Sequence, residues 1–174
     1  MSQQRKPLIL IGFMGTGKTT VGKALADRLK LSLVDTDQEI EKETGKQISE
    51  LFREFGEKGF RDLESRVLKQ VLAGERRVVT TGGGAVLRPE NVRVMKESGW
   101  VIALFASEEE IIRRLSVTSD RPLLRGNLRE RVSLLLEERK GLYDFAHIRV
   151  DTTGLTVEEV VDLICRRLAG MQGV

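Results

Sequence analysis

The stretch with the clearest chemical meaning is residues 12–19, which read Gly-Phe-Met-Gly-Thr-Gly-Lys-Thr. A glycine, four residues, a second glycine, a lysine and a threonine form the pattern of a loop that binds nucleotide phosphates. Gly15 and Gly17 have no Cβ, so the backbone can curl and direct consecutive N–H groups at phosphate oxygens. Lys18 can reach the terminal phosphates, and the Thr19 hydroxyl can bind Mg²⁺. The loop therefore predicts a site for a nucleoside triphosphate and its metal ion.

A phosphate loop needs a strand before it and a helix after it, and both are expected here. Residues 7–11 are a short apolar run suited to a buried strand, and residues 18–30 are good helix formers. The helix would add the positive end of its dipole to the phosphate site. The plain alternative is a glycine-rich turn with an incidental lysine, and the strand and helix in register argue against it.

The rest of the chain alternates between strand and helix patterns. After the strand at 7–11, strands are expected at residues 31–35, 76–81, 100–105 and 147–150. Helices are expected at residues 18–30, 36–43, 49–55, 58–73, from Pro89, from Ser107, 127–145 and 156–169. Five strands alternating with helices predict an α/β fold with a parallel sheet covered by helices on both faces.

Two of the expected helices begin with the spacing of a capping box. Ser107 precedes Glu110 by three residues, and Thr156 precedes Glu159 in the same way. We expect each pair to bond reciprocally at the N-terminus of its helix.

Length and composition indicate one soluble domain over residues 1–174. Of these residues 40% are hydrophobic, and no apolar run approaches the roughly 18 residues that cross a membrane. Lys and Arg (29) exceed Asp and Glu (26) by only 3 and are scattered, which is weak support for a nucleic-acid partner. Cys165 is the single cysteine, and the polar residues 1–6 lead into no signal sequence. We expect a cytoplasmic monomer with no nucleic-acid or membrane partner.

Residues that directly follow the strands are candidates for the site, because ligands bind at the carboxyl ends of parallel strands. Asp35 and Asp37 follow the second strand and, in an extended segment, would point the same way. Two carboxylates beside a triphosphate can divide metal binding from proton abstraction. The alternative for Asp37 is that it only caps the helix that follows.

Three consecutive glycines, Gly82, Gly83 and Gly84, follow the third strand. They do not match the dinucleotide fingerprint, because Leu87 stands at its sixth position, so hydride chemistry is not expected. Three glycines let backbone approach a ligand closely and offer N–H donors to hydroxyl or phosphate oxygens. The alternative is a tight loop that needs positive φ.

Arg139 falls on the gap of an apolar stripe along the expected helix 127–145. The stripe is formed by Leu128, Val132, Leu135, Leu142 and Ala146. A cation facing inward is costly without a partner, so Arg139 needs an anion, either a protein carboxylate or a substrate.

Two further arginines are candidates for anion binding. Arg61 stands at helical spacing from Glu57 and Glu64, so a plain ion pair within the helix is its alternative. Arg121 lies in the irregular stretch 117–126, from which a mobile loop could close over a triphosphate and neutralise charge on the transferred phosphoryl group. Solvated loop charge is the alternative for Arg121. No role is assigned to His147, Cys165 or Trp100.

Taken together, these motifs resemble those of the shikimate kinases over nearly the whole chain. They are the phosphate loop at 12–19, Asp35-Thr36-Asp37, Gly-Glu-Lys-Gly-Phe-Arg-Asp-Leu-Glu at 56–64, Gly82-Gly83-Gly84, Arg-Pro-Leu-Leu at 121–124 and Glu-Arg-Lys-Gly-Leu-Tyr at 138–143. The phosphate loop is shared by many families, whereas the set is specific. The resemblance implies a P-loop NTPase fold like that of nucleoside monophosphate kinases, and ATP- and Mg²⁺-dependent phosphorylation of the shikimate 3-hydroxyl.

The resemblance also implies roles for the acceptor side. Asp37 would hold the shikimate hydroxyls and act as the base, and Asp35 would complete the metal site with Thr19. Arg61 and Arg139 would clamp the substrate carboxylate, and Gly83 would bind a hydroxyl through its backbone. A substrate-binding region is implied at about residues 36–64 and a lid at about 115–127.

On the nucleotide side, the resemblance implies phosphate binding by the loop, a lid arginine at Arg121 and an adenine neighbour at Arg114. The residues implied to hold the phosphates are Gly15, Thr16, Gly17, Lys18, Thr19 and Thr20. The match to the family weakens at 117–120 and at 152–155, where adenine contacts are expected.

Two other functions stay open at this point. A kinase of the same architecture could act on gluconate or a nucleoside monophosphate, although the glycine triplet and the two arginines suit a compact hydroxylated acid. A nucleotide-dependent switch without metabolic chemistry is the second, and Asp37 beside the phosphate loop argues against it.

Overall fold

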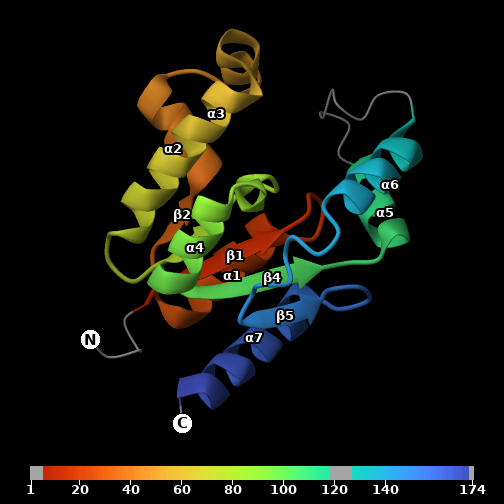
Figure 1. Cartoon of the computed structure of the whole chain (residues 1–174). Helices are drawn as coiled ribbons and strands as arrows, with labels where there is room; N and C mark the ends of the chain where they lie inside the picture. Colours follow the sequence, from red (N-terminus) through yellow and green to blue (C-terminus); the bar gives the residue numbers. More distant parts are fainter. Residues whose placement is uncertain (1–5, 118–126, 173–174) are drawn as a thin grey trace.

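The computed structural model describes residues 6–117 and 127–172 and contains a five-stranded parallel sheet (Figure 1). The strands lie in the order β2-β3-β1-β4-β5. They are β1 (Leu8–Gly12), β2 (Leu33–Asp35), β3 (Val78–Thr80), β4 (Trp100–Phe105) and β5 (Ile148–Asp151). The five parallel strands predicted from the sequence are confirmed, with β2 and β3 two to three residues shorter than expected.

The described residues also form seven α-helices and one short 3₁₀ turn. They are α1 (Lys18–Leu29), α2 (Thr36–Thr44), α3 (Ile48–Leu72), η2 (Ala85–Leu87), α4 (Pro89–Ser98), α5 (Glu108–Val117), α6 (Leu128–Glu138) and α7 (Val157–Gln172). All but α7 lie between strands in the chain. In Figure 1, α2 and α3 rise at the upper left, α5 and α6 at the upper right, and the sheet lies below and between them.

Both faces of the sheet are covered, because alternate residues of its strands enter two separate hydrophobic cores. Ile9 and Ile11 of β1 pack with residues of α3, α4, α5 and α6. Leu8 and Leu10 of the same strand pack with residues of α1 and α7. This alternation is the period of two that a strand imposes, and it leaves all of β1 buried in the centre of the sheet.

Helix α3 contains a sharp break at Gly56, which separates the two helices expected at 49–55 and 58–73. Gly56 has φ 69° and ψ 179°, a conformation that is strained for any residue with a Cβ. The half of α3 after this break carries Arg61 and Glu64, so the glycine helps to set the direction from which both side chains enter the site.

The prediction of a single long helix over residues 127–145 is wrong. Helix α6 ends at Glu138, Arg139 is its C-terminal cap, and Gly141 has φ 81° in a series of turns. The backbone N–H of Leu142 donates to the carbonyl of Arg139, which is turn geometry. A glycine in the left-handed region ends a helix readily, so the apolar spacing beyond residue 138 reflects packing of a turn.

One of the two expected capping boxes is complete. The Thr156 N–H donates to Glu159 Oε2 at 2.8 Å, and the Glu159 N–H donates to Thr156 Oγ1 at 3.2 Å. At the start of α5 only half of the box forms, with Glu110 N–H donating to Ser107 Oγ at 3.2 Å. The carboxylate of Glu110 instead accepts hydrogen bonds from two arginines of its own helix, described below.

Two expectations about the chain as a whole concern the lid and the membrane. The lid expected at about 115–127 falls largely on residues 118–126, so its Arg121 lies outside the described residues. Among the helices of the described residues, none has the length and apolarity needed to span a bilayer.

Candidate active site

The phosphate loop lies between β1 and α1, as the sequence predicts. Gly15 and Gly17 have φ 78° and φ 99°, values that side chains with a Cβ rarely adopt. Gly12 is close to β4, since a Cβ there would lie 2.5 Å from the carbonyl oxygen of Leu104. The Lys18 ammonium donates to the carbonyls of Gly12 at 2.5 Å and Phe13 at 3.0 Å. The loop backbone thus folds back on itself around the Lys18 ammonium group.

Two cavities meet at this loop, and Gly15 and Gly17 line both of them. The larger, of about 440 Å³, extends over the start of α1 to α5 and the loop after β5. The smaller, of about 230 Å³, extends toward the ends of β2 and β3. A ligand in one cavity can therefore approach a ligand in the other across the phosphate loop.

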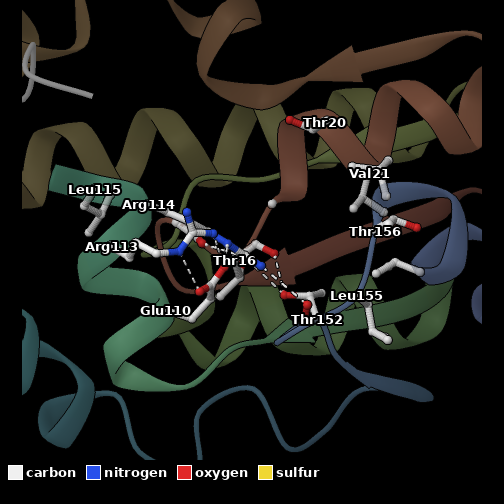
Figure 2. Close-up of a pocket in the computed structure, with 14 residues that line it drawn as sticks. Thr16, Thr20, Val21, Glu110, Arg113, Arg114, Leu115, Thr152, Leu155 and Thr156 are labelled. Atoms are coloured by element: carbon white, nitrogen blue, oxygen red, sulfur yellow. Dashed lines mark hydrogen bonds and ion pairs between the residues drawn. The ribbon is translucent and has the colours of Figure 1, made fainter. Parts of the chain in front are cut away.

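Arg114 lies in the larger cavity, where it is held by the protein (Figure 2). Its Nε donates to Glu110 Oε1 at 2.9 Å, and its Nη1 donates to the Gly15 carbonyl and to Thr152 Oγ1, both at 3.1 Å. Hydrogen bonds from Arg113, and secondarily from Arg114, hold the pKa of Glu110 down to about 2. The expected nucleotide-side position of Arg114 is consistent with these contacts, and the ionised carboxylate fixes its guanidinium.

The sequence did not indicate Glu110 as a partner of Arg114, and it placed Thr152 in the stretch 152–155 expected near the adenine without indicating its contacts with Arg114 and the phosphate loop. Thr152 directly follows β5 and lies in the same cavity as the phosphate loop. The rule that site residues follow parallel strands would have found it. The candidate residues named from the sequence by this rule follow the first three strands.

Asp35 and Asp37 both line the smaller cavity, but they do not lie in one extended segment. Asp35 is the N-cap of α2, where its Oδ1 accepts the Gln38 N–H at 3.0 Å and its Oδ2 accepts the Thr80 hydroxyl at 2.7 Å. The capping role considered for Asp37 therefore belongs to Asp35. Asp37 lies within the first turn of α2 and faces the cavity.

Asp37 is set apart by its electrostatic surroundings. Burial raises its pKa to about 6, and the negative charges of Asp35 and Glu64 add to that effect. Lys18 and Arg61 oppose it. A carboxylate with a pKa close to neutral can accept a proton more readily than an ordinary aspartate, which suits a general base.

Each glycine of the triplet makes room for one charged side chain. A Cβ added at Gly82 would lie 3.0 Å from Oδ1 of Asp37, and one at Gly83 would lie 3.0 Å from Nη1 of Arg139. At Gly84 the Cβ would lie 2.3 Å from Nη2 of Arg61. None of the three glycines has a positive φ among the described residues, so the alternative of a loop that requires positive φ is wrong.

Arg61 makes the ion pair that its spacing predicts, and it is also part of the site. Its Nη1 lies 2.9 Å from Oε1 of Glu64, and its Nε lies 3.9 Å from Glu57. The guanidinium also lies over the ring of Phe60 at 5.3 Å. Glu64 is only 1% exposed, and burial raises its pKa although Arg61 opposes the shift. The plain ion pair is therefore present, but it is buried beside Gly84.

One guanidinium nitrogen of Arg139, Nη1, lies close to Gly83 of the glycine triplet. This nitrogen is buried and has no hydrogen-bond partner among the described residues, and the guanidinium lies 5.6 Å from the ring centre of Phe13. The neighbouring Tyr143 donates its hydroxyl to the Gly83 carbonyl at 2.8 Å. Arg139 itself lines an adjoining cavity of about 330 Å³. The inward-facing cation was predicted correctly, although it stands at a helix end instead of on a helical stripe.

Comparison with known proteins gives a consistent result. The family model described as shikimate kinase matches residues 14–169. A curated shikimate kinase from Pelotomaculum thermopropionicum is 49% identical over 160 residues, which cover 91% of this chain and 93% of the relative. The structure of a shikimate kinase from Acinetobacter baumannii in complex with shikimate is 34% identical, with a TM-score of 0.89, and the match covers 97% of this chain and 95% of that one.

A gluconokinase from Sinorhizobium meliloti is similar in fold only. Its structure is 18% identical with a TM-score of 0.66, over 97% of this chain and 94% of that one.

Proposed function

Because the chain belongs to the shikimate kinase family, we propose that it transfers the γ-phosphoryl group of ATP to the 3-hydroxyl of shikimate. The products are shikimate 3-phosphate and ADP, in the biosynthesis of chorismate and the aromatic amino acids. The observation that carries this proposal is the junction of two cavities at Gly15 and Gly17, with the Asp37 carboxylate on the acceptor side. Phosphoryl transfer needs this in-line placement of donor and acceptor.

ATP occupies the larger cavity and the phosphate loop in this proposal. The N–H groups from Gly15 to Thr20 bind the phosphates at the positive end of the α1 dipole. Lys18 leaves its loop carbonyls to neutralise charge on the transferred group. Arg114 supports the nucleotide from the wall of the cavity. Arg121 is assigned to the lid on the resemblance alone.

Mg²⁺ is assigned to Thr19 and Asp35, and the residues present fit that assignment. Both line the smaller cavity. Mg²⁺ is usually held by one or two protein groups together with phosphates and waters, so one hydroxyl and one carboxylate beside the phosphate loop suit this ion. Each carboxylate oxygen of Asp35 accepts one hydrogen bond and keeps a second lone pair. When bound, the ion would neutralise phosphate charge.

The acceptor hydroxyl lies against Asp37 in this mechanism. At neutral pH a carboxyl with a pKa of about 6 is ionised and can take the proton as the hydroxyl oxygen attacks the γ-phosphorus. Asp37 also orients the hydroxyl, and its closeness to Gly82 fixes the side chain for that task.

The acid group of the acceptor is assigned to Arg61 and Arg139. Arg139 supplies a buried N–H group without a hydrogen-bond partner among the described residues. Arg61 supplies a guanidinium held by Glu64, and a hydroxylated carboxylate between the two would also reach the backbone of Gly83. Planar guanidinium groups recognise carboxylates by paired hydrogen bonds. We further propose that the protein works as a cytoplasmic monomer without nucleic-acid or membrane partners.

The proposed reaction is tested by measuring ADP release from ATP and Mg²⁺ with shikimate, gluconate or nucleoside monophosphates offered in turn. Acceleration by shikimate alone is expected. Acceleration by gluconate or a nucleoside monophosphate would assign the acceptor to the corresponding rival kinase. Slow hydrolysis that no acceptor accelerates would instead indicate a nucleotide switch.

A further inference from the structure

Thr152 stands at the point where the end of β5, the end of β4 and the phosphate loop meet. It is the first residue after β5 and is only 3% exposed. Its side chain lines the larger cavity, and Figure 2 shows it close to Thr16 and to the guanidinium of Arg114. The distance along the chain is large, since Thr152 and Thr16 are separated by 136 residues.

The Thr152 hydroxyl has three polar partners within hydrogen-bond distance. Its oxygen accepts a hydrogen bond from Nη1 of Arg114 at 3.1 Å, and its single proton has two possible acceptors, the carbonyl oxygens of Thr16 at 3.2 Å and Phe105 at 3.0 Å. A guanidinium can only donate, so the hydroxyl oxygen must accept from Arg114. The hydroxyl proton is thereby directed at one of the two carbonyls.

The proton of this hydroxyl is available to the Thr16 carbonyl. The Phe105 carbonyl also accepts the backbone N–H of Thr152 at 2.7 Å, so it has a donor without the hydroxyl. The carbonyl of the preceding residue, Gly15, accepts Arg114 Nη1 at 3.1 Å. Two successive carbonyls of the phosphate loop are therefore held from one side by Thr152 and Arg114.

The orientation of the Thr16 carbonyl determines where the next N–H group points. In a planar trans peptide the C=O and the N–H point in opposite directions. The peptide that carries the Thr16 carbonyl also carries the N–H of Gly17. With that carbonyl bound to Thr152, the Gly17 N–H is directed away from Thr152.

This peptide can turn at its glycine end. Gly15 and Gly17 stand on either side of Thr16, and both glycines have backbone conformations with positive φ. The peptide between Thr16 and Gly17 has a glycine at its N–H end, and a glycine restricts the rotation of that end less than a residue with a Cβ would. A reversed peptide would present a carbonyl dipole to the phosphates instead of an N–H, which repels an anion.

We propose that Thr152 is a positioning residue for the phosphate loop, which aims the Gly17 N–H at the nucleotide phosphates by holding the Thr16 carbonyl. Arg114 assists by orienting the Thr152 hydroxyl, and Glu110 fixes Arg114 through the contact at 2.9 Å. The inference rests on the proposed function only in assigning the phosphates to ATP. It adds a role for a residue that does not need to touch the substrate.

The test compares Thr152→Val, which replaces the hydroxyl by a methyl group, with Thr152→Ser, which keeps the hydroxyl. The dissociation constants of ADP and of inorganic tripolyphosphate are measured by calorimetry, because tripolyphosphate reports the phosphate loop without adenine. Thr152→Val should weaken both about 5- to 20-fold, the effect expected for loss of one hydrogen bond that positions a charged ligand, and Thr152→Ser should stay within about twofold of the parent protein.

Thr153→Val is the matched control in the same loop. The Thr153 hydroxyl accepts the Ser107 N–H at 2.8 Å and so bonds away from the phosphate loop. This variant should bind tripolyphosphate as the parent protein does. In steady-state assays, Thr152→Val should raise the KM for ATP and leave the KM for shikimate unchanged.

Unchanged tripolyphosphate affinity in a folded Thr152→Val variant would overturn the inference, as would an equal loss in Thr153→Val. If Thr152→Val does not fold, Thr152→Ser and Thr152→Ala are compared instead. The Thr152→Ser variant must then bind tripolyphosphate at least about fivefold more tightly than the Thr152→Ala variant. A parent protein that binds tripolyphosphate but never phosphorylates shikimate would contradict the proposed function and leave this inference standing on the binding data.

Discussion

Gly84 and Arg61 lie so close that a methyl group added to the glycine would come within 2.3 Å of the guanidinium Nη2. The backbone of Gly84, with φ −93° and ψ 2°, is accessible to alanine. The obstacle to a larger residue is therefore the arginine side chain, and the glycine determines where that cation lies.

Gly84→Ala is predicted to displace the Arg61 guanidinium and raise the KM for shikimate about 10-fold, with a smaller effect on the KM for ATP. Steady-state kinetics with each substrate varied in turn measures this split. Gly170→Ala on α7 is the control, because a Cβ there meets nothing within 4 Å. Equal changes in the two KM values would show that the glycine acts through general stability.

The fall of kcat/KM at low pH is predicted to follow the ionisation of Asp37. Its pKa of about 6 means that kcat/KM should fall as the pH drops below that value, because the protonated carboxyl cannot accept the substrate proton. Replacing Glu64 with Gln removes a negative charge that raises this pKa, so the fall in rate should move to lower pH. If the fall in rate came from an ionisation of ATP itself, its pH would be the same in Glu64→Gln and in the parent protein. A fall that stays at the same pH in Glu64→Gln would contradict the assignment.

Asp37→Asn is predicted to lower turnover about 100-fold or more while making the fold more stable at neutral pH. The folded pKa of about 6 lies above the model value of 3.8, so the native state binds the proton more tightly than the unfolded state. Stability is therefore lost as the pH rises from about 4 to about 6 and stays low above it, by an amount on the order of 3 kcal/mol.

Urea denaturation at pH 8 and pH 4 measures this effect on the free energy of unfolding. The gain in Asp37→Asn should be present at pH 8 and small at pH 4. Asp27→Asn, at an exposed position of α1, serves as the control for loss of one carboxylate. A variant that is less stable than the parent protein at pH 8 would mean that Asp37 is paired more strongly than its surroundings indicate.

Arg139→Met is predicted to raise the KM for shikimate about 10-fold or more, because one cation of the carboxylate clamp is lost. The melting temperature should stay the same or rise, since Met removes a buried N–H group that has no hydrogen-bond partner among the described residues. Calorimetry and kinetics on the same preparation provide both readings. An unchanged KM with a large fall in melting temperature would indicate that Arg139 pairs with protein alone.

His147 is predicted to make the fold less stable in mild acid. Its Nδ1 accepts the backbone N–H of Val101 at 3.0 Å, and burial, followed by the charges of Lys6 and Lys96, lowers its pKa. A lowered pKa means that the unfolded state binds the proton more tightly, so stability falls as the pH drops through about 6.5 and stops falling below the folded pKa. His147→Asn keeps an acceptor that does not titrate, and its unfolding free energy should lose this component of pH dependence.

The sheet and most of its helices could be predicted because hydrophobic periodicity and glycine positions are local signals. The end of α6 could not, since the apolar spacing continues through a turn made by Gly141. The sequence predicts an inward-facing Arg139 from an apolar stripe on a long helix, which the structure does not contain. Its inward position depends instead on the end of α6 just before it.

The partners within the site were harder to predict than its residues. Asp35 and Asp37 were identified, but the sequence could not show that Thr80 and Gln38 would bind Asp35 and leave Asp37 to the cavity. Contacts such as the one between Thr152 and Thr16 join residues 136 positions apart and leave no periodic pattern. Such pairings are set by the order of the strands, which a single sequence does not reveal.

The strand order β2-β3-β1-β4-β5 has a consequence for how this active site can change over generations. In the proposed assignment, the segments after β2 and β3 carry the acceptor-side groups together with the metal ligand Asp35, and those after β4 and β5 carry residues of the larger cavity. Substitutions in the glycine triplet can thus alter the acceptor side without changing residues of the larger cavity, whereas Gly15 and Gly17 line both cavities. Arg139, which reaches Gly83 from the end of α6, is where the two halves of this division stay tied together.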